Sequence, residues 1–352
     1  MMRPLTALLT MVPLVHGCAI IIGNSSADMG DRYVVPQLMR SGDVGIACRA
    51  GGGLGAVIGS FADYSPRARK TTVTTRMASG MCLDGPVWEA QLDRARSMYL
   101  QDPELAKDSR IREKRVRQLA ARRYFGAYEA LEIAYGLDGV DPAAPEITCP
   151  KFRNDDDEVS FLLGLSSGVL AAINDTVAEG SAGVPMDVPA RVARYAGCLD
   201  NGKWWGVPHA VQAAVWSVLP TAPADVDAWA TFDESIAIGQ AAGVRLAIAF
   251  KAQAAATSGQ RDKLVEAIES MGEASEVSGD PDWSMLDMYA LLLVQHESDR
   301  IWTEARGHRT PFGRLGELPE DEEAPIEVSD DLGGLLDGLL VPEDASTSSS
   351  EE

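Results

Sequence analysis

Residues 102–136, DPELAKDSRIREKRVRQLAARRYFGAYEALEIAYG, contain every signal of one long helix. Asp102 is a favourable N-cap, Pro103 suits the first turn, and Gly136 can end the helix. Apolar side chains recur at helical spacing between these ends, at Val116, Leu119, Ala120, Tyr124, Ala127, Leu131 and Ala134. The stretch therefore predicts a helix over residues 103–135 with one face against a core.

The other face of this predicted helix is basic and includes Arg112, Arg115 and Arg122. The whole chain of 352 residues has a formal net charge of −21, so nucleic acid is excluded as a partner by repulsion of its phosphates. Two interpretations of the basic face stay open. It is a solvated face that balances acids elsewhere, or it binds an acidic protein partner or anionic lipid heads.

Patterns typical of helices also occur on both sides of this stretch. Helices are expected over residues 66–81 and 86–100, and Gly or Pro breaks then separate a series of short Ala-rich helices between residues 210 and 305. The pattern predicts an all-α fold, an array of antiparallel helical hairpins of the TPR-like or α-solenoid type. This helical domain is expected over residues 32–310, with 32–140 and 154–310 as alternative halves around a proline-containing loop.

The N-terminus resembles an export signal that ends in a lipid-attachment box, Leu14-Val15-His16-Gly17-Cys18. Its apolar run is shorter than the roughly 20 residues that a bilayer requires. We expect a signal peptide over residues 1–17, a lipidated Cys18, and a linker over 18–31. Ala19 after the lipidated cysteine favours the outer membrane, facing the periplasm of a bacterial envelope. An ordinary secretory signal, or a cysteine at this position by chance, is the alternative.

Four further cysteines remain: Cys48, Cys82, Cys149 and Cys198. An even number in an oxidising compartment favours two disulfides, with three pairings open, and buried free thiols are the alternative. Their spacing does not fit CxxC zinc chemistry. No metal or cofactor is predicted.

Two adjacent tryptophans, Trp204 and Trp205, lie between glycines just before His209. Such large rings are costly to expose, so they either fill the core or line a ligand or partner cleft.

Residues 164–168, GLSSG, match the GxSxG pattern of a serine hydrolase. That chemistry requires Ser166 on a sharp turn between a strand and a helix. The apolar residues around Ser166 have helical spacing and no strand precedes them, so a hydrolase is the least favoured function and the chain is predicted not to be an enzyme.

Residues 317–352 contain 13 Asp and Glu and no Lys or Arg. This composition predicts a disordered acidic tail, with one short apolar stretch over residues 332–341.

The lipid box, the helical body and residues 77–82, MASGMC, together resemble the TatT-like T-component lipoproteins of TRAP transporters. Residues 161–172 and 239–271 resemble this family best, and the resemblance covers about residues 42–305. It implies a helical, periplasmic scaffold that assembles with a solute-binding protein. A homo-oligomer is a separate possibility that the sequence leaves open. The first expectation is therefore a membrane-anchored interaction lipoprotein that assists TRAP-type solute uptake. The alternative is a lipoprotein that binds a small apolar ligand in a cleft near Trp204, Trp205 and His209.

Overall fold

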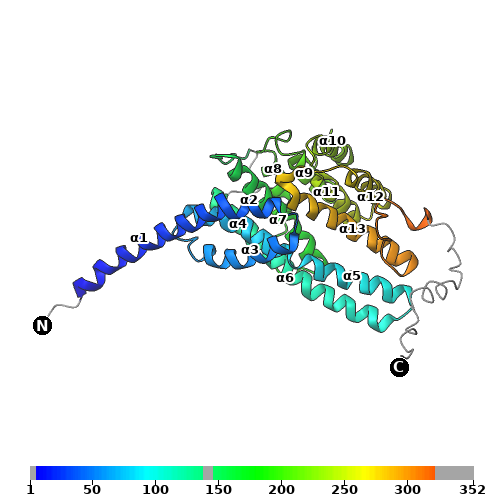
Figure 1. Ribbon diagram of the computed structural model, residues 1–352, viewed down its shortest axis with the longest axis horizontal. Coiled ribbons are helices and arrows are strands. Elements are labelled where there is room, and N and C mark those ends of the chain that lie inside the picture. The colour runs from blue at the N-terminus through cyan, green and yellow to red at the C-terminus, as the bar shows by residue number, and fades with distance from the viewer. Residues whose placement is uncertain (1–4, 138–145, 322–352) are drawn as a thin grey trace, which may run out of the picture.

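The computed structural model describes residues 5–137 and 146–321, and within them the fold is entirely helical. The N-terminal part comprises α1 (Leu5–Met29), η1 (Gly30–Val34), α2 (Val35–Arg40), α3 (Val44–Gly59), α4 (Pro66–Met81), α5 (Asp84–Tyr99) and α6 (Pro103–Tyr135). The remainder comprises α7 (Asp155–Val177), α8 (Val188–Ala196), α9 (Val207–Trp216), α10 (Ala228–Ala241), α11 (Leu246–Ser258), α12 (Arg261–Ser275), η2 (Pro281–Trp283), α13 (Ser284–Arg306) and η3 (Pro319–Asp321). The predicted all-α array is confirmed (Figure 1). The acidic residues 322–352 lie outside the described part.

The long helix α6 is the element around which α4, α5 and α7 pack. Asp102 caps it by accepting a hydrogen bond from the Leu105 amide at 3.0 Å, and Gly136 ends it in the left-handed conformation at φ 70°. Both boundaries agree with the sequence prediction. The sequence placed Leu119 on the apolar face of this helix and Arg117 on the basic face. The structure differs at both positions. Leu119 is exposed, whereas Arg117 is buried and bonded to Glu113 at 2.9 Å.

Helix α7 runs through the centre of the protein, and both glycines of the GLSSG stretch serve its packing. A Cβ placed on Gly164 would lie 2.8 Å from a methyl group of Val73, and one on Gly168 would lie 2.7 Å from the ring of Tyr128. Among the described residues, α7 is the helix that is long and apolar enough to cross a membrane, and 78% of its apolar window is buried inside the protein. The neighbouring helices therefore account for its hydrophobicity.

One hydrophobic core extends from Met39 near the N-terminus to Ile301 in α13. The two halves that the sequence offered as alternatives, residues 32–140 and 154–310, thus share this core.

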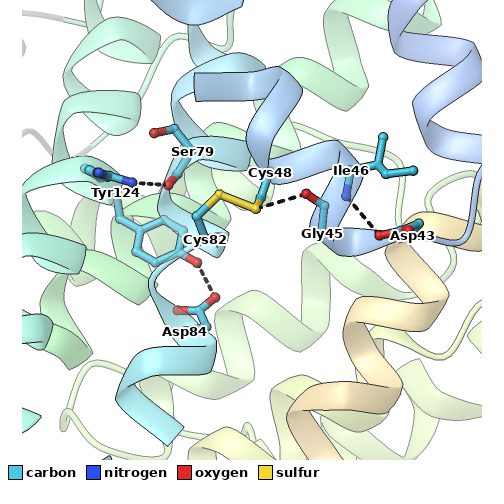
Figure 2. The surroundings of a disulfide bond; sticks show 9 residues. Asp43, Gly45, Ile46, Cys48, Ser79, Cys82, Asp84 and Tyr124 are labelled. Carbon is cyan, nitrogen blue, oxygen red and sulfur yellow. Dashed lines mark hydrogen bonds between the residues drawn. A yellow bond between two sulfur atoms is a disulfide. The ribbon is translucent and has the colours of Figure 1, made fainter. Parts of the chain in front are cut away.

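Two disulfides join elements of this core. Cys48 of α3 is bonded to Cys82 between α4 and α5, and Cys149 in the segment before α7 is bonded to Cys198 after α8. The prediction of two bridges is confirmed, and the structure chooses one of the three pairings. Figure 2 shows the first bridge beside the buried ring of Tyr124.

The segment that we expected to be a linker, residues 18–31, is helical instead. Helix α1 projects from the body in Figure 1, and its C-terminal part packs on α4. Ala27 is fully buried, Ser65 donates a hydrogen bond to Asn24 at 2.7 Å, and Arg67 pairs with Asp28 at 2.6 Å. A Gly, Asn, Ser and Asp composition allows a linker, but these tertiary contacts stabilise the helix.

Candidate functional site

A cavity of about 560 Å³ lies between α7, α9, α11 and α13. Its walls are almost wholly apolar and include Leu163, Leu170, Val215, Ala249 and Leu286. The segment between α7 and α8 contributes Val184, Pro185 and Met186 to the lining, and Met186 is 96% exposed. Small-molecule sites in proteins occupy about 300–1,000 Å³ and are mostly apolar, so this cavity has the size and lining of a ligand site.

Most polar side chains of the lining are already bonded within the protein. The carboxylate of Asp175 accepts hydrogen bonds from the amides of Ala182 and Val184 at 2.7 and 2.8 Å. Thr176 and Thr257 donate to carbonyl oxygens within their own helices. Because Asp175 is the sole charged residue of the lining and is satisfied, the cavity offers no free charge to a ligand.

Two lining residues retain unused hydrogen-bonding groups. Neither the carboxamide of Gln253 nor the indole N–H of Trp205 has a hydrogen-bond partner within the described part of the chain. Both groups are available to bind an uncharged polar group of a ligand.

The two tryptophans singled out in the sequence have different surroundings. Both are buried, at 4% exposure for Trp204 and 6% for Trp205, and both rings contact Trp283. Trp205 lines the cavity, whereas Trp204 donates its indole N–H to Glu158 at 2.6 Å on the other side of the cluster. His209 is exposed on α9 and does not line the cavity. The predicted cleft near Trp204, Trp205 and His209 thus involves only Trp205.

Ser166 lines the same cavity in the middle of α7, not on a turn after a strand. Its hydroxyl donates to the carbonyl of Leu162 at 2.9 Å, and no histidine is among the lining residues. This geometry provides neither the exposed nucleophile nor the base that a serine hydrolase requires.

A buried polar cluster adjoins the cavity through Tyr289, and sequence reasoning missed it. The carboxyl group of Asp84 accepts hydrogen bonds from Tyr124 at 2.6 Å and Tyr289 at 2.7 Å. Burial raises the pKa of Asp84 to about 6, although the two tyrosine hydroxyls and Arg117 oppose this effect. Asp84, Tyr124 and Tyr289 are separated by up to 205 residues, so no local pattern connects them.

A nearby histidine, His296, is also buried. Its Nε2 lies 2.8 Å from Oε1 of Gln91, and its ring stacks on Trp88. Burial lowers the pKa of His296 to about 3, so the ring is neutral at physiological pH and donates from Nε2 to Gln91. We assign it a structural role.

A second cavity of about 240 Å³ lies between α2, α4 and the start of α7. Asp31 and Lys70 line it, and Lys70 pairs with Asp157 at 2.7 Å. Burial raises the pKa of Asp31 to about 6. Within the described residues no group of three His, Cys, Asp or Glu is placed to hold a metal ion.

The three arginines predicted on the basic face lie exposed on α6. Arg112 pairs with Asp93 of α5, whereas Arg115 and Arg122 form no ion pair within residues 5–137 and 146–321. Cys18 is an exposed free cysteine on α1. All these residues lie outside the lining of the large cavity.

Comparison with protein-family models, with curated proteins and with solved structures yields no match for this chain.

Proposed function

We propose that this protein binds a small, uncharged, largely apolar molecule in the cavity between α7, α9, α11 and α13. The observation that carries this proposal is the cavity of about 560 Å³, with its apolar walls and with the exposed Met186 among its lining residues. Apolar space of this size that stays unfilled loses dispersion contacts on every wall, so an apolar occupant is favoured.

The lining also defines the class of ligand. An ionised group inside the cavity would find no free counter-charge, because Asp175 is already bonded to two amides. A hydrocarbon chain or ring system gains ~0.8 kcal/mol per buried CH₂. Ten such groups supply ~8 kcal/mol, from which the cost of association is subtracted, so we expect dissociation constants of about 1 µM or weaker. Gln253 and Trp205 would bind one hydroxyl or carbonyl group of the ligand.

Titration with the apolar fluorescent dye N-phenyl-1-naphthylamine tests this proposal. We expect saturable fluorescence enhancement with the full chain and competition by medium-chain alcohols. Ala249→Trp should weaken dye binding at least tenfold, because Ala249 is a buried wall residue and the indole would fill the cavity.

The matched control is Ala241→Trp, since Ala241 is exposed on α10 and does not line the cavity. Thermal unfolding of both variants shows whether each still folds. Equal dye binding by two folded variants would contradict the proposal.

A second candidate is a membrane-anchored interaction scaffold that assists TRAP-type solute uptake, with a periplasmic solute-binding protein as partner. The projecting helix α1 with its exposed Cys18 supports this candidate, as does the array of helical hairpins. Purification of the full chain from its native membrane, followed by identification of co-purifying proteins, tests it. If no solute-binding protein is recovered with the wild type or with a cross-linked sample, the proposed partner is wrong.

A further inference from the structure

Helix α6 carries an exposed stripe that no other described element covers: Lys107, Ile111, Arg115, Leu119 and Arg122. Their spacing of four, four, four and three residues places them on one face of the helix. Cationic and apolar side chains alternate along this α6 stripe. It is part of neither the ligand cavity nor the disulfide-linked core.

The cations of the α6 stripe differ from their neighbours on the same helix. Arg110 pairs with Glu113 at 2.8 Å, Arg117 pairs with the same carboxylate, and Arg123 donates to the carbonyl of Ser79 at 2.9 Å. Lys107, Arg115 and Arg122 have no such partner in the described part of the chain. The fold therefore supplies partners for these three arginines and leaves the three cations of the α6 stripe free.

The C-terminal segment of this chain has the complementary pattern. Residues 322–352 contain ten Asp and Glu and no Lys or Arg. Within them, Leu332, Leu335, Leu336, Leu339 and Leu340 have the i, i+3, i+4, i+7, i+8 spacing of an amphipathic helix, with Asp330, Asp331 and Asp337 beside them.

The described chain ends close to the tip at which α6 begins. Trp302 of α13 donates to the carbonyl of Glu317 at 3.1 Å, and Arg306 donates to that of Pro319 at 2.7 Å. The C-terminal end of α13 in turn contacts α5, because Arg96 donates to the carbonyl of Gly307 at 3.2 Å. Only residues 100–102 separate α5 from α6.

Leu119 lies 16 residues after the start of α6 at Pro103, which is roughly 24 Å along the helix at 1.5 Å per residue. Ten residues, 322–331, precede Leu332, and an extended chain covers about 3.3 Å per residue, or roughly 33 Å in all. We propose that the segment 330–341 docks on the α6 stripe of the same chain, with its leucines on Ile111 and Leu119 and its carboxylates beside Arg115 and Arg122. Docking covers this basic face until salt or a competing acidic partner releases it.

Site-specific photo-cross-linking of the full chain tests this contact. Benzoylphenylalanine at position 119 should cross-link to a peptide within residues 322–352, and mixed isotope-labelled and unlabelled chains distinguish cross-links within a chain from those between chains. The same cross-linker at position 49, which is exposed on α3, should yield no such product. Absence of a tail peptide at position 119, or a cross-link only to a second copy or to another protein, would overturn the proposal.

The rate at which exposed arginines react with phenylglyoxal is a second readout, and it requires no substitution in the hydrophobic core. Truncation after Asp321 should raise the rate at which phenylglyoxal modifies Arg115 and Arg122 about tenfold, which corresponds to a docking free energy of ~1.4 kcal/mol. Arg115→Glu in the full chain should give the same increase at Arg122, whereas Arg49→Glu should not. Equal rates in the full and truncated chains would overturn the proposal.

Discussion

Leu131 of α6 occupies the space that a side chain at Gly164 of α7 would fill: a Cβ there would lie 2.9 Å from the Leu131 Cβ. The two helices approach so closely because residue 164 is glycine. The glycines of the GLSSG stretch thus serve helix packing, and this explains why a hydrolase-like pattern occurs inside a helix.

We predict that Gly164→Ala destabilises the protein, although alanine favours an isolated helix. Overpacking a well-filled core costs about 1–3 kcal/mol, which exceeds the gain of ~1 kcal/mol in helix propensity. Gly53→Ala in α3 is the matched control, because a Cβ there meets nothing within 4 Å. Urea unfolding should show a loss for Gly164→Ala and a gain for Gly53→Ala. A gain for both would contradict the packing account.

We predict that Asp84 makes the stability of the protein fall as pH rises from 4 to 7. Its pKa is about 6 in the folded state and near 3.8 when unfolded, so the folded state binds the extra proton between these values. The expected loss between pH 4 and pH 7 is roughly 2 kcal/mol. His296 acts in the opposite direction, because its folded pKa of about 3 lies below its unfolded value of 6.5.

Comparison with Asp84→Asn separates the two effects, since the variant retains His296 and Asp31. The free energy of unfolding of the wild type, relative to Asp84→Asn, should decrease between pH 4 and pH 7. A difference that stays constant over this range would show that Asp84 does not titrate with a raised pKa.

The boundaries of α4 and α6 were predictable because their causes are local. The Asp102-Pro103 start and the Gly136 end of α6 agree with the structure, as do the bounds of α4. The burial of Arg117 was not predictable, because its partner Asn174 lies 57 residues away in α7. Periodicity also placed Leu119 on the apolar face, but the structure leaves it exposed on the α6 stripe.

The cavity could not be predicted from the sequence, for a related reason. Its walls come from several separate helices, and their Ala, Val and Leu residues are indistinguishable in sequence from those that fill the core. Of the two tryptophans singled out in the sequence, Trp205 lines the cavity and Trp204 does not. The disulfide pairing likewise depended on distances between segments that are 34 and 49 residues apart.

We predict that peptide mapping without reductant recovers Cys48 joined to Cys82 and Cys149 joined to Cys198. Replacing both members of either pair with serine should lower the free energy of unfolding by about 2–4 kcal/mol, because the unfolded chain regains loop entropy. Recovery of another pairing, or of four alkylated thiols, would contradict the structure.

Lipidation of Cys18 remains a prediction from the Leu14–Cys18 box. We expect mass spectrometry of the native protein to find an N-terminal diacylated Cys18, and Cys18→Ser to release the protein from membranes. A native N-terminus elsewhere without acyl chains would contradict it.

Native mass spectrometry of the full chain, purified from its native source under mild conditions, tests the ligand-binding proposal most directly. We predict an adduct of one small apolar molecule per chain, which is present in the wild type and Ala241→Trp but absent from folded Ala249→Trp. An unliganded wild type that also fails to take up added medium-chain alcohols would contradict the proposal, as would an adduct that Ala249→Trp retains.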